Sequence, residues 1–138
     1  MSALGGLVVN ISSTAGLTCI GDMRASPAYV ASKHAITALT RTFGTDLYFN
    51  RHKVRVIAVA PYFIETSLND DNFSQWTTDA EALEIIRKGF EGKKMLPVDE
   101  AALKLINVLN ARNGSVWLIK PQQMQPFNVP DYVLPKTK

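Results

Sequence analysis

Two short runs of apolar, largely β-branched residues place the strongest constraint on how this chain can fold. The first, residues 7–11 (LVVNI), follows a Gly-Gly pair, and the second, residues 54–60 (VRVIAVA), ends at Pro61. Continuous apolar runs of this length are typical of strands that are buried on both faces of a parallel sheet. A helix-length segment separates them, so the pattern predicts one βαβ unit with a right-handed crossover.

The segment between the two runs predicts one long helix that ends near Asn50. Ser26 places a hydroxyl at the cap position, and Pro27 suits the first helical position. Small and apolar side chains recur at helical spacing on Ala31, Ala35, Ala38, Leu39, Phe43 and Leu47. Such a surface permits close approach either of the sheet or of a second subunit.

The second half of the chain predicts two more helices and one more strand. Residues 78–81 (TDAE) form a capping-box pattern, and Asp99 is expected to cap the next helix. Residues 115–119 (SVWLI) form the third strand. The tail, residues 121–138, is expected to be extended. The chain is therefore predicted to be one partial α/β domain, a three-stranded parallel sheet with covering helices.

Composition argues against several classes of function. The 138-residue chain has a net charge of +3, but its basic residues are scattered, which argues against nucleic-acid binding. We expect no secretion signal, and no run approaches the roughly 20 apolar residues of a membrane span. The single cysteine, Cys19, suits a reducing compartment. We therefore expect a soluble, cytoplasmic protein, and no metal-ligand spacing appears in the sequence.

Four polar side chains near the first strand suggest proton-transfer chemistry. Ser12 and Ser13 follow the strand, whereas Tyr29 and Lys33 lie four positions apart on one face of the helix. A phenol ionises at about pH 10, and a neighbouring ammonium favours its ionised form. A pair of this kind suits acid/base catalysis. A serine hydroxyl opposite can hold the substrate oxygen. The alternative is a pair of solvated helix residues, but the preceding Ser-Ser strand end and the capped helix favour the catalytic interpretation.

Two further polar residues are expected to be structural. Asn10 interrupts the first strand, and its amide is expected to bond to neighbouring backbone rather than to act in catalysis. His34 lies about 100° around the helix from Lys33 and is expected to be a solvated or rim histidine.

Three segments, GGLVVNISSTAG, YVASK and VRVIAVAPYFIET, occur in an order that resembles the C-terminal half of the short-chain dehydrogenase/reductase family. The resemblance extends to about Lys120 and is greatest to the group of 15-hydroxyprostaglandin dehydrogenases and insect-type alcohol dehydrogenases. It implies a Rossmann-like doubly wound parallel sheet and an NAD or NADP cofactor. It also implies hydride transfer between the nicotinamide and a secondary alcohol or ketone.

The resemblance assigns roles to individual residues. Ser13 matches the catalytic serine, Tyr29 the catalytic acid/base, and Lys33 its partner. Tyr29 and Lys33 also match cofactor contacts. Three residues after the second strand match the segment that touches the nicotinamide: Pro61, Ile64 and Thr66. The family further implies a homo-oligomer formed through the helix from Tyr29 to Asn50.

The chain departs from the family pattern in three places. The interval from Ser13 to Tyr29 is longer than usual, so the loop with Cys19 and Arg24 is expected to be lengthened. Tyr62 stands where the family has glycine. No G-x-x-x-G-x-G turn occurs, so we expect a fragment that lacks the Gly-rich cofactor half and is inactive alone. The alternative is a non-catalytic protein that acts through helix-mediated association.

Overall fold

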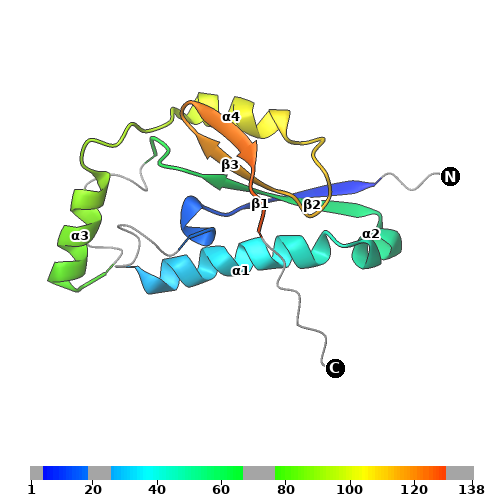
Figure 1. Ribbon diagram of the computed structural model, residues 1–138, viewed down its shortest axis with the longest axis horizontal. Helices are drawn as coiled ribbons and strands as arrows, with labels where there is room; N and C mark the ends of the chain where they lie inside the picture. Colours follow the sequence, from blue (N-terminus) through cyan, green and yellow to red (C-terminus); the bar gives the residue numbers. More distant parts are fainter. Residues whose placement is uncertain (1–4, 19–25, 67–76, 130–138) are drawn as a thin grey trace, which may run out of the picture.

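The computed structural model describes residues 5–18, 26–66 and 77–129. Figure 1 shows its elements, which in chain order are β1 (Gly6–Ile11), the 3-10 turn η1 (Thr14–Gly16), α1 (Pro27–Phe43), α2 (Asp46–His52), β2 (Val54–Pro61), α3 (Ala80–Phe90), α4 (Val98–Asn107), β3 (Val116–Lys120) and β4 (Gln123–Pro126).

The strands form one sheet in the order β1-β2-β3-β4. The first three run parallel, with Gly6 opposite Val54 and Ala58 opposite Val116. This arrangement confirms the predicted α/β class and the βαβ unit. The fourth strand was not predicted, because QMQP lacks the β-branched residues that mark a strand. It lies within the expected extended tail, where a turn after Lys120 folds the chain back so that β4 pairs antiparallel with β3.

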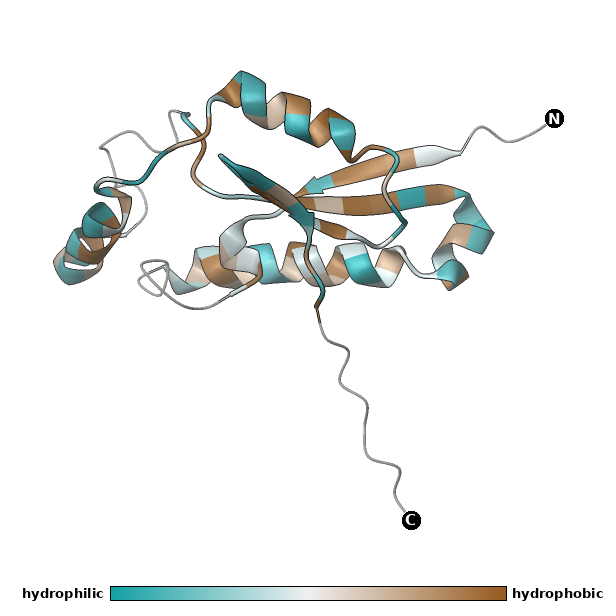
Figure 2. Cartoon of the chain, turned by 45° about the horizontal axis from the view of Figure 1, so that its top comes forward, coloured by the Kyte–Doolittle hydropathy of each residue, from teal (hydrophilic) through white to brown (hydrophobic). Residues whose placement is uncertain are grey.

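Helices cover both faces of the sheet. In Figure 1, α1 and α2 lie on one face, α4 lies on the other, and α3 stands at one end. The larger core lies between the sheet and α4 and contains Ile57, Val59, Leu96, Val108 and Ile119. A smaller cluster of Ala58, Ala60 and Val116 packs against Leu17, which follows η1. The helices carry both colours in Figure 2, as expected for amphipathic elements with one face on a core.

The predicted long helix is in fact two helices. α1 ends at Phe43 and α2 begins at Asp46, and between them Gly44 lies directly against the backbone of Gly114. A Cβ on Gly44 would overlap the Gly114 backbone and would also come within 2.8 Å of the Thr40 carbonyl oxygen. Glycine at position 44 therefore lets the end of α1 pass close to the turn that precedes β3.

The predicted burial of β1 on both faces is wrong for this chain. Val8 is 45% exposed and Ile11 is 49% exposed. Within the part of the chain that the structure describes, β1 has a neighbouring strand only on the β2 side. The residues of β1 carry no charge and no proline, which is typical of an interior strand, yet β1 lies at the edge of the described sheet.

The helix caps also differ from the prediction. Asp79, rather than Thr78, caps α3, and its carboxylate accepts from the backbone N–H of Ala82 at 2.8 Å. Pro97 precedes α4, so Asp99 lies in the first turn instead of at the cap. At α3 the two candidate caps are adjacent, and the sequence pattern cannot separate positions one residue apart. At α4 the predicted and observed caps are two residues apart.

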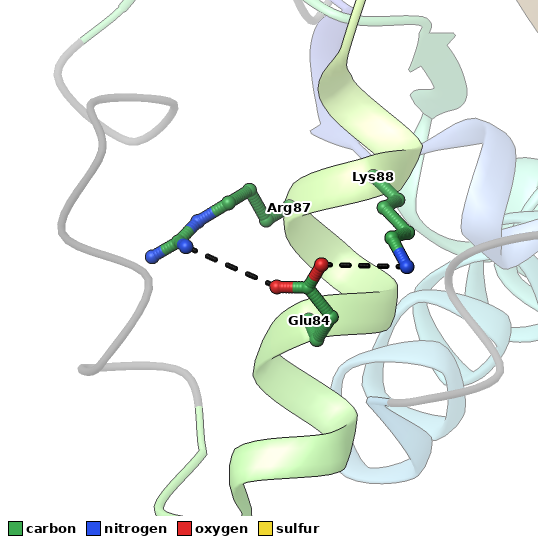
Figure 3. Close-up of polar contacts among 3 residues, drawn as sticks. All are labelled: Glu84, Arg87 and Lys88. Atoms are coloured by element: carbon green, nitrogen blue, oxygen red, sulfur yellow. Dashed lines mark ion pairs between the residues drawn. The ribbon is translucent and has the colours of Figure 1, made fainter.

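The outer face of α3 carries a small ion-pair cluster, drawn in Figure 3. Glu84 pairs with Arg87 at 3.9 Å and with Lys88 at 3.4 Å, and all three side chains are more than half exposed. Pairs in this setting contribute little to stability. The opposite face of α3 buries Ile86, and Phe90 contacts the Phe63 ring with 4.4 Å between centroids.

Candidate active site

The carboxyl ends of the three parallel strands lie together along one side of the sheet, which we call the carboxyl edge, and α/β folds commonly bind ligands there. Ser12 and Ser13 follow β1, and the N-terminal turns of α1 lie beside them and η1 (Figure 1). At the end of β2, the N–H of Tyr62 donates to the Ile119 carbonyl of β3 at 2.8 Å. The candidate residues from separate parts of the sequence therefore reach the same edge.

Lys33 is tied to the end of β1. Its ammonium donates to the carbonyl oxygen of Ile11 at 3.1 Å and lies 5.5 Å from the centroid of the Tyr29 ring. An ammonium has three N–H donors, and the bond to Ile11 uses one of them. The predicted pair is thus assembled next to the strand end that carries the serines.

Ser13 caps η1 and keeps its hydroxyl hydrogen for another partner. Its Oγ accepts from the N–H of Ala15 at 3.1 Å, and the residue is half-buried. Because Ser13 is the acceptor in that bond, its own O–H can still donate. This is what a residue that holds a substrate oxygen requires, although the catalytic role of Ser13 stays a prediction.

Ser12 points into the protein. It is 3% exposed, and its Oγ lies 3.0 Å from the Lys33 carbonyl oxygen and 2.9 Å from the Thr37 hydroxyl. Both contacts join the strand to α1. Its hydroxyl is therefore occupied by internal partners, which favours Ser13 over Ser12 as the serine that meets a substrate.

The prediction that the Asn10 amide bonds to neighbouring backbone is wrong, because its partner is a side chain of α1. Its amide donates to the Thr40 hydroxyl at 2.9 Å, and Thr40 is fully buried in α1. His34 lies with Nδ1 2.9 Å from the Val30 carbonyl oxygen on its own helix.

The segment after β2 is held by a short stretch of backbone pairing. Ile64 forms an isolated bridge with Leu96, and the Leu96 N–H donates to the Phe63 carbonyl at 2.8 Å. Pro61 is the last residue of β2, and Thr66 is exposed at the end of the described segment. All three residues predicted to touch the nicotinamide thus lie at or just after the end of β2. Their contact with a cofactor stays a prediction.

Sequence reasoning missed Gly16 and Thr37. A Cβ on Gly16 would overlap the Ser12 Oγ and the Lys33 carbonyl, so only glycine fits between η1 and α1. Thr37 faces Ser12 from a helix position with no distinctive local pattern. The sequence signal for each was weak, because both contacts depend on how β1 and α1 pack.

Three further predictions concern the loop with Cys19 and Arg24, metal binding and membrane spans. The loop with Cys19 and Arg24 lies in residues 19–25, of which the structure describes nothing. In the segments that are described, no group of His, Cys, Asp and Glu residues is placed to hold a metal ion. No helix of those segments has the length and apolar character that a membrane span needs.

Comparison with known proteins identifies the family. A family model described as short chain dehydrogenase matches residues 1–77, which is more than half of the chain. The chain belongs to the short-chain dehydrogenase family. It is 30% identical over 122 residues to the NAD(+) 15-hydroxyprostaglandin dehydrogenase of Rattus norvegicus, covering 83% of this chain and 44% of that protein. It is 29% identical over 125 residues to Fat body protein 2 of Drosophila melanogaster, covering 88% of this chain and 46% of that protein.

A solved structure also matches. The crystal structure of levodione reductase superposes with a TM-score of 0.57 at 24% identity, covering 84% of this chain and 45% of that one. This likeness shows the fold. The chain spans less than half the length of each of these three relatives.

Proposed function

We propose that this chain supplies the proton-transfer part of an NAD(P)-dependent oxidoreductase that interconverts a secondary alcohol and a ketone. The observation that carries the proposal is the position of Lys33, whose ammonium lies 3.1 Å from the Ile11 carbonyl and 5.5 Å from the Tyr29 ring centroid. This places a cation beside a phenol at the sheet edge where ligands bind. The family membership makes an oxidoreductase the expected class.

Tyr29 is the proposed acid/base. The Lys33 ammonium lies 5.5 Å from the centroid of the Tyr29 ring, so a positive charge stands near the group that would exchange the proton. In alcohol oxidation the phenolate oxygen takes the hydroxyl proton of the substrate. In ketone reduction the Tyr29 hydroxyl returns a proton to the substrate oxygen. The hydroxyl hydrogen of Ser13 is donated to the same substrate oxygen, and this bond stabilises the negative charge that develops there.

The residues present fit one end of a nicotinamide cofactor. Lys33 keeps two N–H donors for ribose hydroxyls, and the backbone-held segment with Pro61, Ile64 and Thr66 lies at the same sheet edge. When bound, the nicotinamide accepts or donates the hydride. The phosphates normally need a Gly-rich turn before a helix, and this sequence has no such motif. We therefore propose that cofactor binding depends on protein segments beyond those in this chain.

The names of the relatives refine the proposal. The rat relative is named as an NAD(+) enzyme, a 15-hydroxyprostaglandin dehydrogenase. This supports NAD over NADP and an apolar secondary alcohol as the substrate class.

We also propose that copies of the chain associate through α1 and α2. Leu39, Phe43 and Leu47 are 51%, 44% and 62% exposed on these helices. Apolar side chains clustered in this way commonly mark an interaction surface. A cytoplasmic location is proposed from the single cysteine, which suits a reducing compartment.

A chimaera tests the proposed function. The N-terminal half of the rat relative is joined to this chain, and NADH formation is followed with a series of secondary alcohols. Turnover that depends on Tyr29 supports the proposal, and Tyr48→Phe serves as the matched control because Tyr48 lies on α2 away from the site. A folded chimaera that binds NAD but oxidises none of the alcohols would overturn it.

A further inference from the structure

Three oxygen atoms meet between β1 and α1 directly behind the candidate site. The Ser12 Oγ lies 3.0 Å from the Lys33 carbonyl oxygen and 2.9 Å from the Thr37 Oγ1. The Thr37 hydroxyl also lies 3.2 Å from the same carbonyl. Ser12 and Thr37 are 3% and 6% exposed, so water does not compete for these contacts. We call this group, Ser12, Thr37 and the Lys33 carbonyl, the hydroxyl clamp.

The hydroxyl clamp is the part of the β1–α1 interface that involves the candidate residues themselves. Lys33 is held at two points, because its carbonyl meets Ser12 and its ammonium meets Ile11. Ser13 follows Ser12 in the chain, and Tyr29 lies one helical turn before Lys33. Any shift between the strand end and the helix must therefore stretch the contacts that Ser12 makes.

Gly16 packs the turn η1 onto the clamp. A side chain there would overlap the Ser12 Oγ and the Lys33 carbonyl. The turn also carries the bond from the Ala15 N–H to the Ser13 Oγ. The glycine thus allows the turn that orients the Ser13 side chain to rest directly on the clamp.

We propose that Ser12, Thr37 and Gly16 are positioning residues, which fix the Ser13 hydroxyl relative to the Tyr29–Lys33 pair without contacting the substrate. This inference rests on the proposed function for the meaning of that geometry. Its physical basis is that catalysis by oriented groups is lost when their separation changes by a fraction of an ångström to an ångström.

Ser12→Ala is the sharpest variant. It removes the contacts of the Ser12 hydroxyl with the Lys33 carbonyl and with Thr37. Thr37 can still donate to the Lys33 carbonyl, so no buried hydroxyl is left without an acceptor. Thr37→Val is a second variant with a smaller expected effect, because Ser12 retains the Lys33 carbonyl. Thr37→Ser keeps the hydroxyl and is expected to behave like the parent.

The neighbouring polar contact supplies a matched control. Asn10 and Thr40 join the same strand to the same helix through one bond of 2.9 Å, and Thr40 donates in turn to the Ile36 carbonyl rather than to Lys33. Thr40→Val leaves the Asn10 amide without that acceptor, so it is expected to lower stability at least as much as Ser12→Ala. It is not expected to disturb the site.

Two measurements on the chain itself test the proposal. Amide hydrogen exchange is measured at Ala15, Gly16 and Leu17, relative to the slowest amides of β2. The rate of Lys33 acetylation by acetic anhydride is measured relative to Lys88, which is exposed on α3. Ser12→Ala is expected to speed exchange of the turn amides by about tenfold and to raise the relative reactivity of Lys33, whereas Thr40→Val changes neither.

Equal effects of Ser12→Ala and Thr40→Val, or no local effect of Ser12→Ala, would overturn the clamp as a positioning device. In the chimaera, Ser12→Ala is expected to lower kcat about tenfold with little change in KM, and Thr37→Ser to retain parent values. An unchanged kcat in Ser12→Ala would also overturn it. An inactive parent chimaera would count against the proposed function alone, since exchange and acetylation do not require turnover.

Discussion

The ammonium of Lys33 donates to the carbonyl oxygen of Ile11 at 3.1 Å, so a helix residue of the candidate pair is anchored to the last residue of β1. The same ammonium lies over the Tyr29 ring, 5.5 Å from its centroid. One side chain therefore links the strand that carries the serines to the tyrosine proposed to transfer the proton.

Tyr29→Phe is expected to lower turnover of the chimaera by at least about a hundredfold, because it removes the only atom of that side chain that can exchange a proton. Steady-state oxidation of a secondary alcohol measures the effect. Tyr48→Phe should leave the rate near the parent value. A Tyr29→Phe enzyme as fast as the parent would assign the proton to another group.

Ser13→Ala and Ser12→Ala are expected to differ. Ser13 retains a donor hydrogen at the sheet edge, whereas Ser12 is 3% exposed and engaged with Lys33 and Thr37. We expect Ser13→Ala to cost about a hundredfold in kcat, roughly ten times more than Ser12→Ala. Equal losses in the two variants would remove the distinction between a residue that contacts the substrate and one that positions it.

The isolated chain is expected to bind NADH more weakly than micromolar. Its candidate site has donors for the nicotinamide end, but the sequence has no Gly-rich turn for the phosphates. Calorimetric titration of the purified chain measures the affinity. A micromolar dissociation constant would contradict this expectation and would require a different phosphate site.

Association of the chain is expected to depend on α2 rather than α4. Leu47 on α2 and Leu103 on α4 are 62% and 63% exposed, so the two leucines form a matched pair. Leu47→Glu should shift sedimentation toward a smaller species, because it places a charge in the proposed contact surface. Leu103→Glu should not. A monomeric parent chain, or equal shifts in both variants, would refute association through α1 and α2.

Gly44→Ala is expected to destabilise the fold by about 2 kcal/mol, because the added methyl group meets the Gly114 backbone, which cannot move aside as a flexible side chain would. Urea unfolding measures the change. Gly6→Ala provides the control, since its Cβ would meet only the Val54 side chain at an ordinary 3.4 Å. Similar losses in both variants would mean that the close contact between Gly44 and Gly114 does not exclude a side chain at position 44.

Local patterns predicted the elements that depend on local chemistry. The apolar runs identified β1 and β2, the Ser26-Pro27 pair marked the start of α1, and the Tyr29–Lys33 spacing placed both residues on one helix face. Each of these follows from strand or helix periodicity. The residues themselves grouped Ser12 and Ser13 with this pair, and the family resemblance selected Ser13. The structure places Ser13, Tyr29 and Lys33 near the carboxyl end of β1.

Features that depend on distant contacts could not be predicted. The close backbone contact at Gly44 involves Gly114, which is far along the chain, and the clamp depends on the packing of η1 against α1. Ser12 and Ser13 are chemically identical in sequence, and only the direction of each side chain separates them. β4 was missed because its pairing comes from a turn, while its own residues have low strand propensity.

The two edge strands of the sheet, β1 and β4, differ in how readily a further strand can pair with them. At one edge, β4 is a four-residue strand of two glutamines, a methionine and a proline, and short polar strands that contain proline resist further pairing. At the other edge, β1 offers six residues without charge or proline. Additional strands can therefore join this sheet at β1, whereas β4 ends it, so the architecture can be extended on one side only.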